Sequence, residues 1–295
     1  MNTLIPFLFL VLYTPYLKAQ TDVPLVKIQY KFTHVLDTLQ RDKPHIEDMV
    51  LFVGKTSTLF GNYEEEQRMN ALAEQVKSGL FDGHLTIIGS GTTPSPTFFY
   101  HHPSKNSKAI HQIGSKKYIV NEEYPDLTWE LLEDTKEILG HPCQAAQTSH
   151  GGRKYNAWFN TTLQLVGAPW KLQGLPGVLF EVQDEQGEVK FEITSLEPME
   201  PSTRLIGTDP ALIPASAKEL LRLREAVQNS ARLNPNNILS TPPNRGSTHY
   251  LVLGGGYSDD LNSLIDPSQI KSVNVIKNGP QISKTINNPI EKNKR

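Results

Sequence analysis

The stretch Gly174-Leu175-Pro176-Gly177, together with the residues that follow it up to 196, decides the fold of this chain. Proline followed by glycine is typical of a type II turn, which needs a positive φ at its second central residue, and we expect Gly177 to supply it. Apolar and polar residues then alternate over 178–183 and over 189–194, on either side of a polar loop that ends in Gly187. This alternation predicts two antiparallel strands, with one face in the core and the other wetter.

The N-terminus has the composition of an export signal. Residues 4–13 form the only long apolar run, and the small residue Ala19 follows six positions later. The run is too short to span a bilayer, so we interpret residues 1–19 as a signal peptide removed before Gln20. This predicts a periplasmic or secreted protein with no transmembrane segment in the mature chain. Because no Lys or Arg precedes the run, an uncleaved anchor is the alternative.

Composition argues against several classes of function. The chain has 295 residues, of which 38% are hydrophobic, as in an ordinary soluble protein with a sizeable core. Its formal net charge of −2 argues against a nucleic-acid partner, since such proteins carry a basic surplus. Cys143 is the single cysteine, which rules out an intramolecular disulfide even in an oxidising compartment.

Residues 20–233 are predicted to form one β-rich domain. Strands are expected over 25–35 and 49–60, and short apolar segments separated by turn residues follow one another from 117 to 196. Strands in succession without intervening helices indicate an antiparallel sheet. The expected fold class is mainly β (α+β), with a curved antiparallel sheet or open half-barrel.

One or two helices are expected to pack on this sheet. Residues 64–77 carry apolar side chains spaced three and four apart, which is the period of an amphipathic helix. A second helix is expected to begin near Ser216, because Ser216 and Glu219 have the spacing of a capping box.

The C-terminal part is predicted to be organised differently. Residues 234–247 are rich in proline and asparagine and are interpreted as a linker. Residues 248–280 are expected to form a small β-turn-β module, with a strand over 272–277. The polar residues 281–295 are expected to form a flexible tail.

The block from Trp129 to Leu179 resembles the GLPGLI family, which is named for its Gly-Leu-Pro-Gly-Leu-Ile motif. This chain has Val178 and Leu179 after Gly174-Leu175-Pro176-Gly177. The resemblance also rests on spaced motifs, namely Trp129, Glu133-Asp134-Thr135-Lys136-Glu137-Ile138-Leu139-Gly140, Cys143-Gln144-Ala145-Ala146, Gly152-Arg153, Tyr155, Ala157-Trp158-Phe159 and Gly167-Ala168-Pro169-Trp170-Lys171. It implies an exported protein of a Gram-negative envelope, in a family without an established activity.

Two further resemblances concern architecture. The strand succession is similar to the open half-barrels of periplasmic lipoprotein carriers, which implies a concave apolar face. The stretch Ile265-Asp266-Pro267, Ile270 and Val273-Asn274-Val275-Ile276-Lys277-Asn278-Gly279 resembles the strand-turn-strand element in plug domains of TonB-dependent receptors. That resemblance implies at most a docking or structural module.

The sequence predicts no catalytic, metal or cofactor site. His101, His102 and His111 lack a cysteine or carboxylate at zinc-site spacing, and adjacent strand residues point to opposite faces. Cys143 with His141 or His150 has no diagnostic spacing for a nucleophile and base, so a hydrolase is the least favoured interpretation.

The candidate ligand-binding residues are aromatic and basic. Trp129, Tyr155, Trp158 and Trp170 either fill the core or form a wall that faces a ligand. In the second case Arg153 and Lys171 would lie at the rim and meet an anionic headgroup, and Lys154 is a further candidate for the same role. The set Gly174, Leu175, Pro176 and Gly177 is interpreted as a structural motif.

Two hypotheses of function follow. The first is a non-enzymatic exported protein that binds a lipid or other apolar or amphipathic ligand on its curved sheet. The alternative is an interaction module that docks an outer-membrane or periplasmic partner through residues 248–280.

Overall fold

The computed structural model describes residues 22–63, 67, 82–89, 95–113, 116–200, 205–233, 272–277 and 286–292. The expected signal peptide, the linker over 234–247, residues 248–271 of the expected C-terminal module and nearly all of the helix expected over 64–77 lie outside the described residues. Among the described residues, no helix combines the length and the apolar character needed to cross a membrane.

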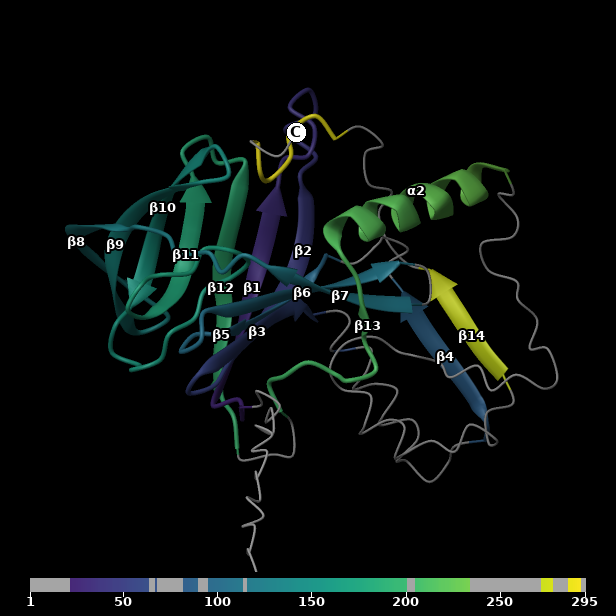
Figure 1. Cartoon of the computed structure of the whole chain (residues 1–295). Coiled ribbons are helices and arrows are strands. Elements are labelled where there is room, and N and C mark those ends of the chain that lie inside the picture. The colour runs from purple at the N-terminus through teal and green to yellow at the C-terminus, as the bar shows by residue number, and fades with distance from the viewer. Residues whose placement is uncertain are drawn as a thin grey trace, which may run out of the picture.

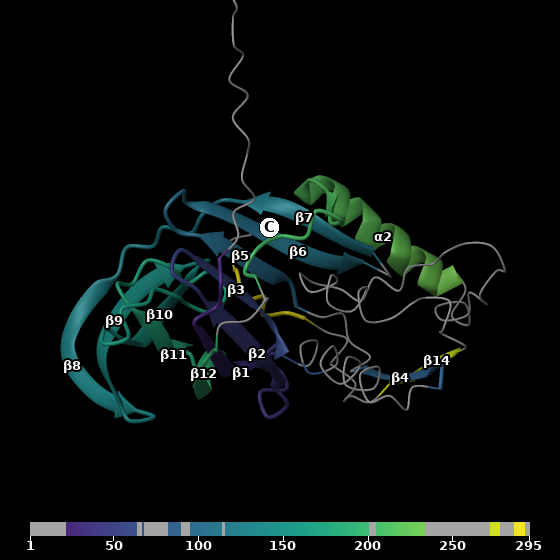
Figure 2. The ribbon, with the colours of Figure 1, turned by 90° about the horizontal axis from the view of Figure 1, so that it is seen from below.

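Most of the described chain forms one large, open sheet of twelve strands. Its order is β13-β7-β6-β5-β3-β2-β1-β12-β11-β10-β9-β8, and all neighbours are antiparallel except β13 and β7. In Figure 2 the sheet curves from β8 through β1 to β7 without closing. The strands are β1 (Val26–His34), β2 (His45–Val53), β3 (Ser57–Asn62), β5 (Thr97–His101), β6 (Asn106–Ile113), β7 (Lys116–Glu122), β8 (Glu130–Ile138), β9 (His141–His150), β10 (Arg153–Asn160), β11 (Val178–Asp184), β12 (Val189–Pro198) and β13 (Ile213–Pro214). The expected mainly β fold with a curved, open antiparallel sheet is confirmed.

One expected strand is in fact two. The run 49–60 turns at residues 54–56, between β2 and β3. Gly54 N donates to Ser57 O at 2.9 Å, and the Asp22 carboxylate accepts hydrogen bonds from Thr56 N and Ser57 N. The turn therefore depends on a carboxylate more than thirty residues away, which apolar periodicity does not reveal.

The hairpin β11–β12 is confirmed. Val182 pairs with Phe191, and Gly187 closes the loop with a φ of +64°. Asp184 Oδ1 accepts hydrogen bonds from the N–H groups of Glu188 and Val189, at 2.7 and 3.0 Å. The loop is therefore fixed by a carboxylate that belongs to the strand before it.

The prediction that Gly177 has a positive φ in a type II turn is wrong. The positive φ, +112°, lies at Gly174, whereas Gly177 has no such φ. A Cβ at Gly177 would lie 2.1 Å from the carbonyl oxygen of Asn160, so this position needs glycine because a neighbouring strand passes close to it. Leu175 between them is buried and Pro176 is exposed.

The segment 161–177 fills one face of the large sheet, which we call the inner face. Tyr100 donates from its hydroxyl to Trp170 O at 2.8 Å, and Trp129 donates from Nε1 to Gln173 O at 2.9 Å. The apolar side chains that this segment adds to the core are Ala168, Trp170, Leu172 and Leu175. The expected concave apolar face therefore packs against the chain itself.

The helix and the second sheet lie at one end of the molecule (Figure 1). Helix α2 (Ala217–Leu233) begins with the expected capping box, in which Ser216 N donates to Glu219 Oε2 and Glu219 N donates to Ser216 Oγ. Its Leu220 packs with Ile113 and Val120 of the large sheet. The strand expected over 272–277 is β14 (Ser272–Lys277), and it pairs in parallel with β4 (His84–Gly89). The strand of the expected C-terminal module thus shares a sheet with residues from the N-terminal half.

The residues 286–292, which we call the C-terminal segment, differ from the flexible tail expected over 281–295. They lie beside β1 and β12, as the yellow segment next to the C mark in Figure 1. Asn288 is only 3% exposed, and Ile290 packs against the main core. The polar residues that predicted a frayed tail instead form hydrogen bonds with polar groups of the sheet and its loops.

Candidate binding sites on the two faces of β10

Strand β10 presents two different surfaces, because successive side chains of a strand point to opposite faces. Arg153, Tyr155, Ala157 and Phe159 are buried on the inner face. Lys154, Asn156 and Trp158 point outward, and the first of these is exposed while the other two are half-buried. The candidate residues of this strand are thus divided between two sites.

Arg153 forms the first site, which we call the Arg153 cleft. Its side chain has no exposed surface, and Nη1 donates to Asp184 Oδ2 at 2.5 Å and to Glu188 Oε2 at 3.0 Å. Asp184 is the last residue of β11, and Glu188 belongs to the loop between β11 and β12. The turn before β10 contains Gly151, with a φ of +58°, and brings its carbonyl to the edge of the cleft.

The charges in the cleft are stabilised by hydrogen bonds. Burial opposes ionisation of Glu188, but hydrogen bonds from Arg153, Arg41 and Asn288 outweigh it and lower the pKa of this carboxyl to about 2. Burial also lowers the pKa of His34 to about 4, and the nearby Arg153 charge adds to this effect. At neutral pH the cleft therefore holds an ionised Glu188 and an uncharged His34.

The C-terminal segment occupies the cleft. Arg153 donates from Nη2 to Asn288 Oδ1 at 2.6 Å and to Pro289 O at 2.9 Å, and from Nε to Ile290 O at 3.1 Å. His34 Nε2 lies 2.9 Å from Asn288 O, a hydrogen bond in which the ring must donate. Arg153 thus contacts three consecutive residues of the segment and two carboxylates of the sheet.

Lys171 lies beside the same segment, although it follows Arg153 by eighteen positions. Its Nζ is 3.0 Å from both Glu122 Oε2 and Glu291 Oε1. Burial disfavours the charged amine, but the hydrogen bonds to these carboxylates outweigh it and raise the pKa of Lys171. The structure therefore brings Arg153 and Lys171 to one site, where they contact a peptide segment of the chain.

Three of the aromatic candidates lie in the core instead. Tyr155 and Trp170 are 1% and 6% exposed, and Trp129 is half-buried against the same core cluster, which Trp158 also contacts at its edge. The Trp170 ring packs edge-on against His150, with centroids 5.3 Å apart. These positions correspond to the first of the two interpretations, core filling.

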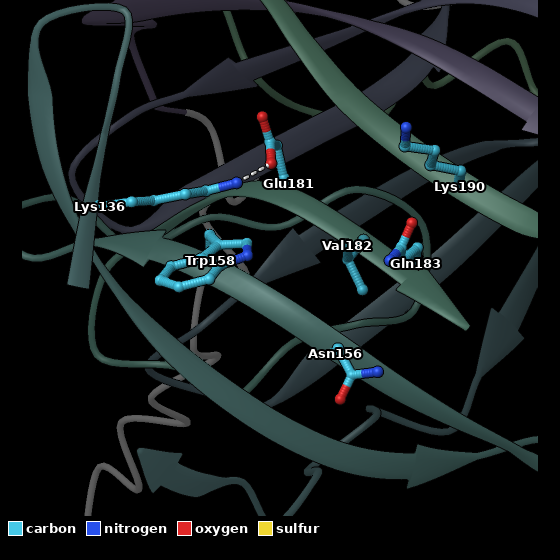
Figure 3. A pocket seen from close by; sticks show the side chains of 7 residues that line it. All are labelled: Lys136, Asn156, Trp158, Glu181, Val182, Gln183 and Lys190. Carbon is cyan, nitrogen blue, oxygen red and sulfur yellow. Dashed lines mark hydrogen bonds and ion pairs between the residues drawn. The ribbon is translucent and has the colours of Figure 1, made fainter. Parts of the chain in front are cut away.

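Trp158 belongs to a pocket on the outer face, which we call the Trp158 pocket. The pocket has a volume of about 130 Å³. Lys136 Nζ lies 4.6 Å from the centroid of the Trp158 ring and is paired with Glu181. Figure 3 shows Lys136 reaching past the ring towards Glu181. The residues that line the pocket are Lys136, Asn156, Trp158, Glu181, Val182, Gln183 and Lys190.

Sequence reasoning missed most of this pocket. Asn156, Glu181, Gln183 and Lys190 share the outward parity of their strands, because Trp158 pairs with Glu181 and Asn156 with Gln183. That parity was readable in the alternation. The outward position of Lys136 could not be predicted in this way, because the register of β8 shifts between residues 131 and 135.

The thiol and imidazole candidates have structural partners. Cys143 is 2% exposed, its S–H group lies 3.6 Å from His141 O, and burial raises its pKa to about 11. The ring of His141 packs edge-on against Phe180. The thiol is therefore protonated at neutral pH.

The three histidines considered as metal ligands in the sequence each contact a different partner. His101 Nδ1 lies 2.7 Å from Ser104 Oγ, His102 Nδ1 lies 2.7 Å from Tyr124, and His111 Nδ1 lies 2.9 Å from Arg224. Over the described ranges, no cluster of three or more His, Cys, Asp or Glu residues is placed to hold a metal ion.

Together, the sheet and its two sites define a β-rich protein with an open, curved sheet. No protein-family model and no curated protein sequence matches the chain. Two solved structures of PNGF-II, in space groups P21 and C2, are similar with a TM-score of 0.48 and 13% sequence identity. They cover 69% of this chain, whereas the chain spans only 34% and 33% of the respective PNGF-II chains.

Proposed function

We propose that this protein is an exported, non-enzymatic member of the GLPGLI family that binds a small amphipathic anion in the Trp158 pocket. The observation that carries the proposal is the pocket itself, in which an indole ring and two lysines surround a space of about 130 Å³. A cavity of about this size accepts a ligand with a body as large as one aromatic ring.

The lining suits a ligand with an apolar body and a negative head. Trp158 supplies apolar surface, while Asn156 and Gln183 supply amide groups that donate and accept hydrogen bonds. Lys136 and Lys190 carry two positive charges against the single carboxylate among the lining residues, so the lining has a net positive charge. Lys190 is also paired with Glu192 outside the lining, at 2.6 Å.

The outer face is the better location for such a ligand than the inner face. The segment 161–177 already contributes Trp170, Leu172 and Leu175 to the core on the inner face. A ligand there would have to displace packed apolar side chains, at a cost of several kcal/mol. The hypothesis of ligand binding on the curved sheet therefore moves from its concave to its convex face.

Binding is tested with octanoate, a carboxylate with an apolar chain, by calorimetric titration into the purified chain. We expect saturable binding that falls at least tenfold in Trp158→Ala and in Lys190→Gln. Lys154→Ala is the matched control, because Lys154 lies on the same face of β10, is exposed and does not line the pocket. Equal affinity of Trp158→Ala and the parent chain would overturn the proposed site.

Export is tested separately by expressing the chain in a Gram-negative host and fractionating the cells. We expect the periplasmic form to begin at Gln20 in intact-mass analysis, because Ala19 precedes the expected cleavage site. A chain retained in the cytoplasm with residues 1–19 attached would contradict export without bearing on the pocket.

A further inference from the structure

The Arg153 cleft holds the C-terminal segment in the way that proteins hold short peptides, mainly through the main chain of the bound segment. The carbonyl groups of Asn288, Pro289 and Ile290 accept hydrogen bonds from His34 and Arg153. The N–H groups of the segment also donate to the sheet and its loops, from Asn287 and Asn288 to Leu36 O at 3.1 Å and from Lys292 to Gly151 O at 2.6 Å.

Side chains of the segment add a recognisable pattern to these main-chain contacts. Asn288 donates from Nδ2 to Val35 O at 2.7 Å and to Glu188 Oε2 at 3.0 Å, while its Oδ1 accepts from Arg153. Ile290 packs against the core, and Glu291 pairs with Lys171. The cleft thus contacts the side chains of an asparagine, an aliphatic residue and an acid at positions 288, 290 and 291.

The charge of Arg153 also has partners that do not belong to the segment. Arg153 is paired with Asp184 and Glu188, which belong to the adjacent hairpin, and Asp184 accepts two further main-chain hydrogen bonds there. Removal of the segment would therefore leave no unpaired charge in the cleft. It would free two nitrogens of Arg153, which then present N–H groups to any peptide of similar shape.

The segment itself is weakly anchored by apolar burial. Residues 286, 287, 289 and 292 are exposed, and Asn288 is the only buried one of the seven. Segments with few buried apolar contacts open at a lower free energy than the core. Release of the segment is therefore separable from unfolding of the sheet.

From these observations we propose that the Arg153 cleft is a peptide-binding site, that residues 286–292 are its intramolecular ligand, and that a partner protein inserts a segment in their place, with an asparagine, any residue, an aliphatic residue and an acidic residue in that order. The site lies on the face of β10 opposite to the Trp158 pocket, so its failure and the failure of anion binding are distinguishable.

The probe is a fluorescently labelled synthetic peptide of residues 284–295, titrated into the full chain and followed by anisotropy. Because the tethered segment competes at a high effective concentration, the parent chain should bind the peptide weakly. The Asn288→Ala chain has an intact cleft and a weakened segment, and we expect it to bind the peptide at least tenfold more tightly. A peptide that itself carries Asn288→Ala should bind this chain at least tenfold more weakly, and one that carries Glu291→Lys should also lose affinity.

Several results would overturn the proposal. One is the absence of saturable binding to a folded Asn288→Ala chain, and another is equal binding of the altered and unaltered peptides. Loss of the folded state in Asn288→Ala would show that the segment is part of the core. Self-association of the parent chain that Asn288→Ala abolishes would assign the cleft to a second copy instead of a partner.

Hydrogen exchange of the parent chain gives a test that needs no variant. We expect the amides of Asn288 and Lys292, which are hydrogen-bonded to the sheet, to exchange at least a hundredfold faster than the paired amides of β10. Equal rates would show that the segment leaves only when the whole sheet unfolds, and would overturn its role as an exchangeable ligand.

Discussion

The two faces of β10 carry residues of similar chemistry in opposite circumstances. On the inner face Arg153 is fully buried and is fixed by two carboxylates. On the outer face Lys136 lies over Trp158 with about a third of its side chain exposed and with one carboxylate beside it. A buried charge must be paired, whereas an exposed one is also stabilised by water. Substitutions on the inner face should therefore change stability first, and those on the outer face should change binding first.

The largest effect is expected from Arg153→Leu. This change leaves Asp184 and Glu188 without their shared cation, and breaking a buried ion pair from one side costs about 3–5 kcal/mol of unfolding free energy. Urea denaturation measures the loss. Lys154→Ala is the matched control from the next position, where the exposed pair with Glu185 should contribute less than about 0.5 kcal/mol. Similar losses in both variants would contradict the distinction between the faces.

A smaller loss is expected from Gly177→Val, in the motif that supports the inner face. The new side chain would collide with the carbonyl of Asn160, and overpacking of this kind costs roughly 1–3 kcal/mol. Gly187→Ala separates contact from backbone strain, because Gly187 has a φ of +64° but no atom within 4 Å of an added Cβ. We expect that control to cost about 1 kcal/mol in the same urea measurement. If Gly187→Ala lowered the unfolding free energy more than Gly177→Val does, backbone strain at a positive φ would cost more than the close approach of Asn160.

A pH-dependent loss should follow from His34. Burial, opposed by the hydrogen bond to Asn288 O, places the folded-state pKa of His34 at about 4, below its ordinary value of 6.5. The unfolded chain therefore takes up a proton first, and stability falls as the pH drops from 6.5 to 4. Across that interval we expect the parent chain to lose about 2 kcal/mol more than His34→Gln. Parallel pH curves of the urea midpoint for the two chains would contradict this.

The carboxyl of Glu188 should affect stability at a lower pH than His34 does. Its pKa of about 2 lies below the ordinary 4.5, so its contribution is present above pH 4.5 and is lost as the pH falls towards 2. His34→Gln should leave that second decline in place.

Much of the sheet could be predicted from the sequence, because strand formation here follows local alternation. The pattern over Val178–Asp184 and Val189–Pro198 is enough to give a hairpin, and the structure contains it. The reason for glycine in the preceding motif was not predictable. A positive φ at Gly174 and a close approach to Asn160 at Gly177 both require glycine, and the residue type alone does not distinguish them.

The two sites were predictable to different degrees. The parity of β10 separates Arg153 from Trp158, so their division between two faces is implicit in the strand. The ligand of Arg153 is not, because the C-terminal segment comes from more than 130 positions away in sequence and is held by hydrogen bonds without any apolar period. Long-range polar contacts of this kind leave no local signal.

The smallest effect is expected from the pair Lys136 and Trp158 on the outer face. The ammonium lies 4.6 Å from the ring centroid, and a partly exposed cation–π contact contributes about 0.5–1 kcal/mol. A double-mutant cycle with Lys136→Met and Trp158→Leu should therefore give a coupling energy in that range by urea denaturation. The pair Lys154 and Glu185, 3.6 Å apart on the same surface, is the control and should couple more weakly. A coupling above about 2 kcal/mol would mean that the outer face is as dependent on fixed charges as the Arg153 cleft, and the contrast between the two faces of β10 would no longer hold.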